Sequence, residues 1–393
     1  MPKIQELDEI SISDLRATGA TKWNRDDEAI GAFVAEMDFG IAESIQNRLH
    51  TEVDKGLFAY LPPKLQKEMR ESVANYLRNT QDWAVNPAQI YEMPDVVACY
   101  RAAYNTFTSP DSKIIVPTPS YMPFLFVPPI DGREVIEVPM LVDEETQSYS
   151  YDLAKLEAAF DNGGELLVLC NPHNPTGRVM KRSELQDIEE LVARKNGRVF
   201  SDEIWSPLVF EPNQHISYAS IGERAAEHTV TAMAASKAFN LPGLKCAQLI
   251  LTNPKDQERW EEVGPIEMHG AANLGLAATS TAFNECLEWL DDIVAYLDRN
   301  RLALSTMIKE QMPEAKATFP EGTYVAWIDL SAYDFDGSIS DFLVENAGVM
   351  CTEGTACGEA GKGHIRFIFA MPLPILKEAV SRIADALHSA NKR

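Results

Sequence analysis

Residues 231–245 read Thr-Ala-Met-Ala-Ala-Ser-Lys-Ala-Phe-Asn-Leu-Pro-Gly-Leu-Lys. The apolar run 229–233 predicts a short buried strand that ends just before Ser236 and Lys237. A Pro-Gly turn and a second lysine, Lys245, follow. A lysine directly after the end of a strand, with another cation nearby, is well placed to lose its proton and attack a carbonyl. A solvated loop lysine is the simpler interpretation, so the rest of the chain must decide.

The composition of the whole chain narrows the class of protein. The 393 residues suffice for two structural units, and 45% of them are hydrophobic, as in ordinary globular proteins. With 35 basic and 59 acidic residues, the formal charge of −24 argues against nucleic acid or an anionic membrane as the main partner. No signal peptide is evident and no apolar run approaches the roughly 20 residues of a membrane span. We therefore expect a cytoplasmic protein.

The six cysteines are scattered along the chain and show no CxxC pairing of the metal-binding type. Free thiols in a reducing compartment are the default expectation for such a pattern. We expect no metal site.

Strands and helices alternate through the middle of the chain. The predicted strands are 113–116, 134–138, 165–170, 198–201, 229–233 and 246–251. This alternation predicts a mostly parallel sheet with helices on both faces. In such sheets, ligands bind beyond the carboxyl ends of the strands. Three polar clusters fall there: 171–177, Asp202, and Ser236 with Lys237.

The remaining segments predict further elements around this sheet. We expect a short strand at 33–35, helices at 64–80 and from Asp95, a capping box at 183–186 whose helix is closed by Gly197, and a long helix at about 284–311. A smaller α+β domain follows, with strands at 323–330 and 364–370, a glycine-rich connection at 348–363 and a terminal amphipathic helix. The expected division is 1–40 as an N-terminal segment joining the small domain, 41–285 as the large domain and 286–393 as the small domain.

Three positions keep two interpretations each at this stage. Arg366 lies inside an apolar strand, where its charge needs either a ligand carboxylate or a structural salt bridge. Tyr60, on an exposed bend before paired prolines, is either a packed aromatic or a site residue. The helix start after Asp95 offers N–H groups that can hold a phosphate, although every helix has such a start.

Four motifs together resemble one family. They are Asn171-Pro-His-Asn-Pro-Thr-Gly177, Ser201-Asp-Glu-Ile204, Ser236-Lys237 with Asn240-Leu-Pro-Gly-Leu-Lys245, and Gly363-His-Ile-Arg366. In this order they resemble the fold-type I pyridoxal 5'-phosphate (PLP) enzymes of the class I/II aminotransferase superfamily. Ala35-Glu-Met-Asp-Phe39 and the Gly-Leu-Lys ending at Lys245 narrow the resemblance to MalY/PatB-type carbon–sulfur β-lyases. The resemblance covers almost the whole chain and implies an α/β fold with a central sheet of the seven-stranded type.

The resemblance also implies a role for individual residues. Lys237 would hold PLP as a Schiff base, and Asp202 would keep the ring nitrogen protonated so that the ring can accept electrons. Arg366 would bind the substrate carboxylate. The other implied contacts are Asn174 to the ring 3-oxygen, Tyr121 on the ring face, Val96, Val97, Ser236 and Lys245 at the phosphate, and Tyr60 from the second subunit of a homodimer whose active sites lie at the interface.

Three positions depart from the family pattern. Trp205 stands where relatives usually have Tyr or His near the 3-oxygen, and an indole can donate a hydrogen bond but cannot accept one. Ala234 replaces a hydroxyl residue that binds phosphate in many aminotransferases, which leaves more of that task to Lys245. Cys357 takes a position that is often aromatic in the lyases, so we expect a substrate pocket of different size.

The implied reaction is α,β-elimination of L-cystathionine or a cysteine S-conjugate to pyruvate, ammonia and a thiol, with Lys237 as general base. Transamination is the alternative within PLP chemistry, because it uses the same motif residues. A PLP-binding regulator without turnover is the third possibility, and the presence of Lys237, Asp202 and Arg366 argues against it.

Overall fold

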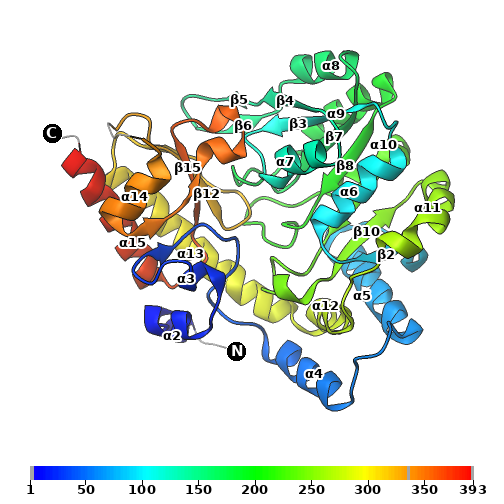
Figure 1. The fold of residues 1–393 in the computed structure, drawn as a ribbon, viewed down its shortest axis with the longest axis horizontal. Coiled ribbons are helices and arrows are strands. Elements are labelled where there is room, and N and C mark those ends of the chain that lie inside the picture. The colour runs from blue at the N-terminus through cyan, green and yellow to red at the C-terminus, as the bar shows by residue number, and fades with distance from the viewer. Residues whose placement is uncertain (1–3, 334–336, 391–393) are drawn as a thin grey trace.

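The computed structural model describes residues 4–333 and 337–390 (Figure 1). Its centre is a seven-stranded sheet in the order β2-β10-β9-β8-β7-β3-β4. Only β10 runs antiparallel to its neighbours within that sheet, so the predicted mostly parallel sheet is confirmed. The strands are β2 (Ile90–Met93), β3 (Lys113–Thr118), β4 (Val135–Pro139), β7 (Gly164–Cys170), β8 (Arg198–Asp202), β9 (Thr229–Met233) and β10 (Ala247–Leu251).

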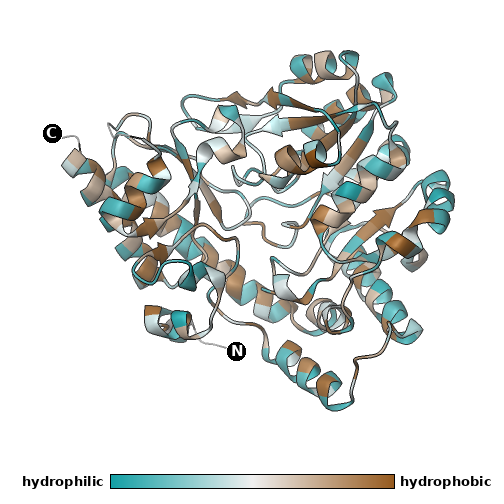
Figure 2. Cartoon of the chain, viewed as in Figure 1, coloured by the Kyte–Doolittle hydropathy of each residue, from teal (hydrophilic) through white to brown (hydrophobic). Residues whose placement is uncertain are grey.

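Both faces of this sheet are buried, because alternate residues of its strands enter different cores. In β7, Leu166 and Val168 belong to one apolar cluster, whereas Leu167 and Leu169 belong to the other. The covering helices are α5 (Pro63–Gln81), α6 (Val96–Phe107), α7 (Pro123–Ile130), α8 (Leu153–Asp161), α9 (Arg182–Lys195), α10 (Glu223–His228), α11 (Pro254–Glu267) and α12 (Asn273–Glu285). Helix α7 is apolar along its whole length (Figure 2).

A second sheet forms the smaller unit, in the order β11-β12-β15-β14. Its elements are β11 (Lys316–Ala317), β12 (Val325–Asp329), β14 (Thr352–Glu353) and β15 (His364–Ile368), with the helices α13 (Leu287–Gln311), α14 (Ile339–Ala347) and α15 (Leu373–Ala390). Near it, β1 (Ile30–Gly31) pairs in parallel with β13 (Val349–Met350). This pairing supports the proposed division, in which the N-terminal segment joins the small domain.

The N-terminal segment is also held by a buried ion pair. The Nζ atom of Lys22 lies 2.8 Å from Oδ2 of Asp38, and both side chains are almost fully buried. The indole N–H of Trp23 donates to the other oxygen of Asp38, and Lys22 also donates to the backbone carbonyl of Ala370. The remaining short elements are α1 (Ile4–Asp8), α2 (Ile12–Ala17), α3 (Thr21–Asn24), α4 (Glu43–Asp54), β5 (Leu141–Val142) and β6 (Tyr149–Ser150).

Three local predictions, one strand and the two ends of α9, were wrong. No strand forms at 33–35 in the described structure, because the pairing with β13 falls on Ile30–Gly31. The predicted capping box at 183–186 begins two residues earlier: α9 starts at Arg182, and the Glu184 carboxylate accepts from the N–H of Lys181. Asn196, not Gly197, takes the left-handed conformation that ends α9.

The long helix predicted at 284–311 is divided at Cys286, between α12 and α13. The glycine-rich connection 348–363 is more regular than expected, since it holds β13, β14 and two short 3-10 turns. The terminal helix and the helix that opens after Asp95 are confirmed. Within residues 4–333 and 337–390, no helix is both long and apolar enough to cross a membrane.

Candidate active site

Lys237 follows β9 at the carboxyl end of the central sheet. Its amine donates a hydrogen bond of 2.8 Å to the backbone carbonyl of Ala35, and the Tyr324 hydroxyl donates to the same oxygen at 3.1 Å. The amine also lies 5.7 Å from the ring centroid of Trp205. Burial, and next the charge of Arg366, lower the pKa of Lys237 to about 8. A larger fraction of the Lys237 amine is therefore deprotonated near neutral pH, and so able to attack a carbonyl, than in an ordinary surface lysine.

Asp202 is the last residue of β8, and its carboxyl group is buried. Oδ1 accepts from the N–H of Ile204 at 3.1 Å, and the Cys170 thiol lies 3.8 Å from Oδ2. No cation pairs with Asp202 in the described part of the chain, and burial raises its pKa to about 7. A carboxyl group in this state is ready to hold a cationic ring nitrogen, because such a partner would offset the cost of its ionisation.

Two amides of the 171–177 segment, those of Asn171 and Asn174, each have one buried atom without a hydrogen-bond partner among the described residues. Asn171 accepts from the N–H of Met180 at 3.0 Å, and the His173 ring pairs with the Thr176 hydroxyl at 2.9 Å. Asn174 is buried as well, yet its Oδ1 atom has no hydrogen-bond partner among the described residues. Buried polar atoms without partners are rare, and a ligand is one reason for them. Asn174 therefore fits a contact with a cofactor.

Arg366 lies in β15 and is 2% exposed. Its guanidinium makes only long contacts: 3.4 Å to the Phe33 carbonyl, 3.4 Å to the Thr352 hydroxyl and 3.6 Å to the Met122 sulfur. Its Nε atom has no partner and no carboxylate pairs with it among the described residues, and burial lowers its pKa. Of the two interpretations of Arg366, the structural salt bridge is wrong within the described chain. A site for a ligand carboxylate remains.

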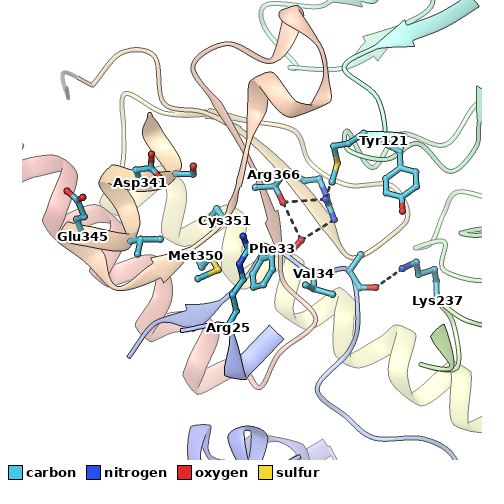
Figure 3. A pocket seen from close by; sticks show the side chains of 15 residues that line it. Arg25, Phe33, Val34, Tyr121, Lys237, Asp341, Glu345, Met350, Cys351 and Arg366 are labelled. Atoms are coloured by element: carbon cyan, nitrogen blue, oxygen red, sulfur yellow. Dashed lines mark hydrogen bonds between the residues drawn. The ribbon is translucent and has the colours of Figure 1, made fainter. Parts of the chain in front are cut away.

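Lys237, Tyr121 and Arg366 line one cavity of about 690 Å³ (Figure 3). Lys237 and Tyr121 lie toward one end of the cavity, and Arg366 lies nearer its middle. Asp202 and Asn174 do not line this cavity, but the charge of Asp202 acts on both Lys237 and Tyr121. The sequence motifs did not single out several other residues of the site: Val34, Met122, Tyr324 and Thr352. Ala35 opens one of the motifs, but its carbonyl was not expected to hold the Lys237 amine.

Some of the residues expected to bind the cofactor phosphate lie close together. Val96 and Val97 open α6, whose first N–H groups lack intrahelical partners, as at any helix start. Lys245 reaches this helix start, where its amine lies 3.0 Å from Oδ2 of Asp95. Asp95 also caps α6 by accepting from the N–H of Ala98 at 2.8 Å. A phosphate would therefore share Lys245 with the Asp95 carboxylate, which also caps the helix.

Four other residues lie outside the cavity lining. Ser236 is half-buried next to Lys237, and Ala234 is buried just beyond β9. Cys357 is fully buried and does not itself line the cavity. Tyr60 is 99% exposed on the connection between α4 and α5, away from the cavity of its own chain. All six cysteines are free and buried, as expected.

These residues fit PLP. Asp202 can hold a protonated ring nitrogen, Asn174 has an unsatisfied amide, and Lys237 has a lowered pKa in the same cavity as the unpaired Arg366. Trp205 is buried and packs edge-on against Tyr324, with ring centroids 4.7 Å apart. The indole therefore forms part of the wall around Lys237.

Comparisons with known proteins agree with this geometry. The model of the family described as aminotransferase class I and II matches residues 35–383. The chain is 32% identical to a cystathionine beta-lyase of Corynebacterium glutamicum, over 96% of this chain and 99% of the relative. It is 30% identical to the cystathionine beta-lyase PatB of Bacillus subtilis, over 94% and 97% of the two chains.

Solved structures give the same result. A putative PLP-dependent beta-cystathionase from Corynebacterium diphtheriae superposes with a TM-score of 0.91 at 36% identity, covering 96% of this chain and 98% of that one. A PLP-bound C-S lyase from Staphylococcus hominis gives a TM-score of 0.87 at 28% identity, covering 96% and 98%. The fold-type I architecture and the MalY/PatB resemblance are confirmed. The chain belongs to the class I and II aminotransferase family.

Proposed function

We propose that this protein is a PLP-dependent carbon–sulfur β-lyase. It would act on L-cystathionine or related cysteine S-conjugates and release pyruvate, ammonia and a thiol. Relatives named cystathionine beta-lyase match nearly the full length of the chain. The observation that carries the proposal is the placement of Lys237, with its pKa lowered to about 8, in one cavity with the unpaired Arg366.

PLP bound at this site supplies an electron sink for the charge left when the substrate loses its Cα proton. Asp202 contributes by holding a proton at the ring nitrogen, because its buried carboxylate needs a cationic partner. Arg366 binds the substrate α-carboxylate through its planar fork of N–H donors. That contact fixes the Cα–H bond relative to Lys237.

Lys237 has two tasks in the proposed mechanism. Its amine would hold the cofactor covalently in the absence of substrate, and the same amine would take the Cα proton of a bound substrate. The Cβ–Sγ bond breaks, and its electron pair leaves on sulfur as a thiolate. The remaining three-carbon enamine hydrolyses to pyruvate and ammonia. The Ala35 carbonyl orients the amine in this sequence, and the Tyr324 hydroxyl shares that acceptor.

The phosphate of PLP would bind at the N–H groups of Val96 and Val97, with Ser236 and Lys245 beside it. Tyr60 would reach the bound phosphate only from a second copy of the chain. Its complete exposure, and the 72% exposure of nearby Phe58, support a homodimer in which this segment is covered. Helix α4 and the connection that carries both residues project from the rest of the molecule (Figure 1). The free buried cysteines support a cytoplasmic location.

Transamination is the second candidate, because the matching family is that of the class I and II aminotransferases. In that reaction, the amine of Lys237 would return the proton to the cofactor rather than promote loss of the thiolate. The same residues serve both outcomes, so an assay must decide between them.

The decisive assay uses purified protein with PLP and L-cystathionine, without any keto acid. We expect release of pyruvate and a free thiol. Turnover that depends on an added keto acid would refute the lyase proposal in favour of an aminotransferase. Cofactor binding without turnover of any amino acid would support a regulator. A Lys237→Ala protein that keeps full activity would refute the mechanism.

A further inference from the structure

The cavity that holds Lys237 and Arg366 continues to a charged outer rim, formed by Arg25, Asp341 and Glu345. Asp341 and Glu345 are four residues apart on α14, so they lie on one face of that helix. Figure 3 shows them at the end of the cavity opposite Lys237, with Arg366 between and Arg25 on another wall. Two carboxylates and one guanidinium therefore lie together at the outer end of the cavity.

The three rim side chains make no hydrogen bond or ion pair with other described residues. The Arg25 guanidinium instead lies 5.2 Å from the ring centroid of Phe33, another residue of the cavity wall. The helix dipole accounts for the presence of an acidic residue only at Asp341. Asp341 lies in the first turn of α14, where a negative charge stabilises the helix. Glu345 lies in the last turn, where the helix dipole disfavours a negative charge. Glu345 is exposed at the cavity mouth, so its carboxylate is accessible to a ligand there.

Much of the remaining cavity lining is apolar, with Phe33, Val34, Met122, Val344 and Met350. Such a lining suits methylene groups and a thioether sulfur. The middle of the cavity is marked independently as a ligand site by Arg366, which is 2% exposed and has an unpartnered Nε. Met350 lies between Arg366 and the outer rim (Figure 3), so the cavity passes from a charged group, over an apolar side chain, to charged groups again.

From this order we infer that the outer rim binds a second amino-acid head group at the far end of the substrate. Its ammonium would lie against Asp341 and Glu345, and its carboxylate against Arg25. Thioethers that carry an amino acid at each end are then preferred over S-alkyl cysteines. This inference rests on the proposed lyase function and specifies its substrate class.

Four substrates isolate the two charges. L-Cystathionine carries both at its far end, and S-(3-aminopropyl)-L-cysteine lacks only the distal carboxylate. S-(3-carboxypropyl)-L-cysteine lacks only the distal ammonium, and S-propyl-L-cysteine lacks both. Pyruvate release by the PLP-loaded enzyme gives kcat/KM for each. All four substrates share the reacting cysteine part, so the ratio of each kcat/KM to that of S-propyl-L-cysteine measures only the effect of the distal charges at the outer rim.

The variants are Asp341→Asn with Glu345→Gln, and Arg25→Met. The double acid variant should lower the ratio for cystathionine and the aminopropyl substrate by about 3- to 20-fold, the range for two exposed charge contacts. Arg25→Met should lower the ratio for cystathionine and the carboxypropyl substrate by about 2- to 5-fold. Glu310→Gln, an exposed acid of α13 outside the cavity, is the matched control and should leave every ratio unchanged.

Ratios that stay constant in the rim variants, or that change equally in Glu310→Gln, would overturn the inference while leaving the lyase function intact. Absence of pyruvate from all four substrates would instead refute the lyase function. In that case, dissociation constants of the same four compounds for the PLP-loaded protein test the outer rim. Equal constants in wild type and variants would then overturn the inference.

Discussion

Replacement of Arg366 by Met should make the protein more stable and nearly inactive. The guanidinium is 2% exposed, has no carboxylate partner among the described residues, and makes only three contacts of 3.4–3.6 Å. An uncompensated buried charge is costly, and Met keeps most of the aliphatic length of the side chain. We expect the free energy of unfolding of the cofactor-free protein to rise by about 1–3 kcal/mol.

The same change should remove the receptor for the substrate carboxylate. Two charge-assisted hydrogen bonds contribute about 1.5–3 kcal/mol each. Their loss should lower kcat/KM by about 10²- to 10⁴-fold, at roughly 1.4 kcal/mol per factor of ten. The positive charge of Arg366 also helps to lower the pKa of Lys237, so this pKa should rise above about 8 in the variant.

Urea unfolding followed by tryptophan fluorescence measures the first effect, and pyruvate release from L-cystathionine measures the second. Arg101→Met is a suitable control, because Arg101 is half-exposed and pairs with Asp131 away from the cavity. It should cost at most about 1 kcal/mol and leave kcat/KM unchanged. An Arg366→Met protein that is less stable than wild type, or that keeps kcat/KM within about threefold, would contradict the assignment of a carboxylate site.

Four further outcomes follow from the site and from the ion pair that holds the N-terminal segment. Lys237→Ala should abolish the visible absorbance of covalently bound PLP. In the wild type, the rate of PLP incorporation should rise with pH and level off above about 8, because only the deprotonated amine attacks; a rate independent of pH would contradict this. Asp95→Asn keeps the cap on α6 but frees Lys245 from its carboxylate, so equilibrium dialysis should show about 2- to 5-fold tighter PLP binding. Lys22→Met leaves the charge of Asp38 buried without its partner and should cost about 3–5 kcal/mol in urea unfolding, most of which Asp38→Leu in the same chain should restore.

The sequence alone was sufficient for the central sheet and for the residue types of the site. Apolar runs such as 165–170 have the length and pattern of strands buried on both faces, and the structure places Leu166 and Leu167 in opposite cores. Asp202 and Lys237 follow such runs directly. Parallel strands bring their carboxyl ends to one edge, so local pattern was enough to predict that these side chains converge.

Local pattern was less reliable at the ends of elements. The start of α9, the end of α9 at Asn196 and the break at Cys286 depend on single hydrogen bonds and single backbone angles. Neighbouring residues offer nearly equal alternatives there, and composition cannot choose among them. The strand expected at 33–35 failed for another reason: its true pairing, at Ile30, is with Val349, a residue more than 300 positions away.

What only the tertiary structure decided is the set of contacts between distant segments. The amine of Lys237 is held by the Ala35 carbonyl, 202 residues away, and the Tyr324 hydroxyl shares that acceptor. The sequence placed Arg366 in an apolar strand but left open whether an internal carboxylate pairs with it; packing brings none within reach in the described chain. Residue pattern encodes which side chains are buried and at which strand end they lie. Which of them meet, and which are left unpaired for a ligand, depends on how the two sheets and the N-terminal segment pack together.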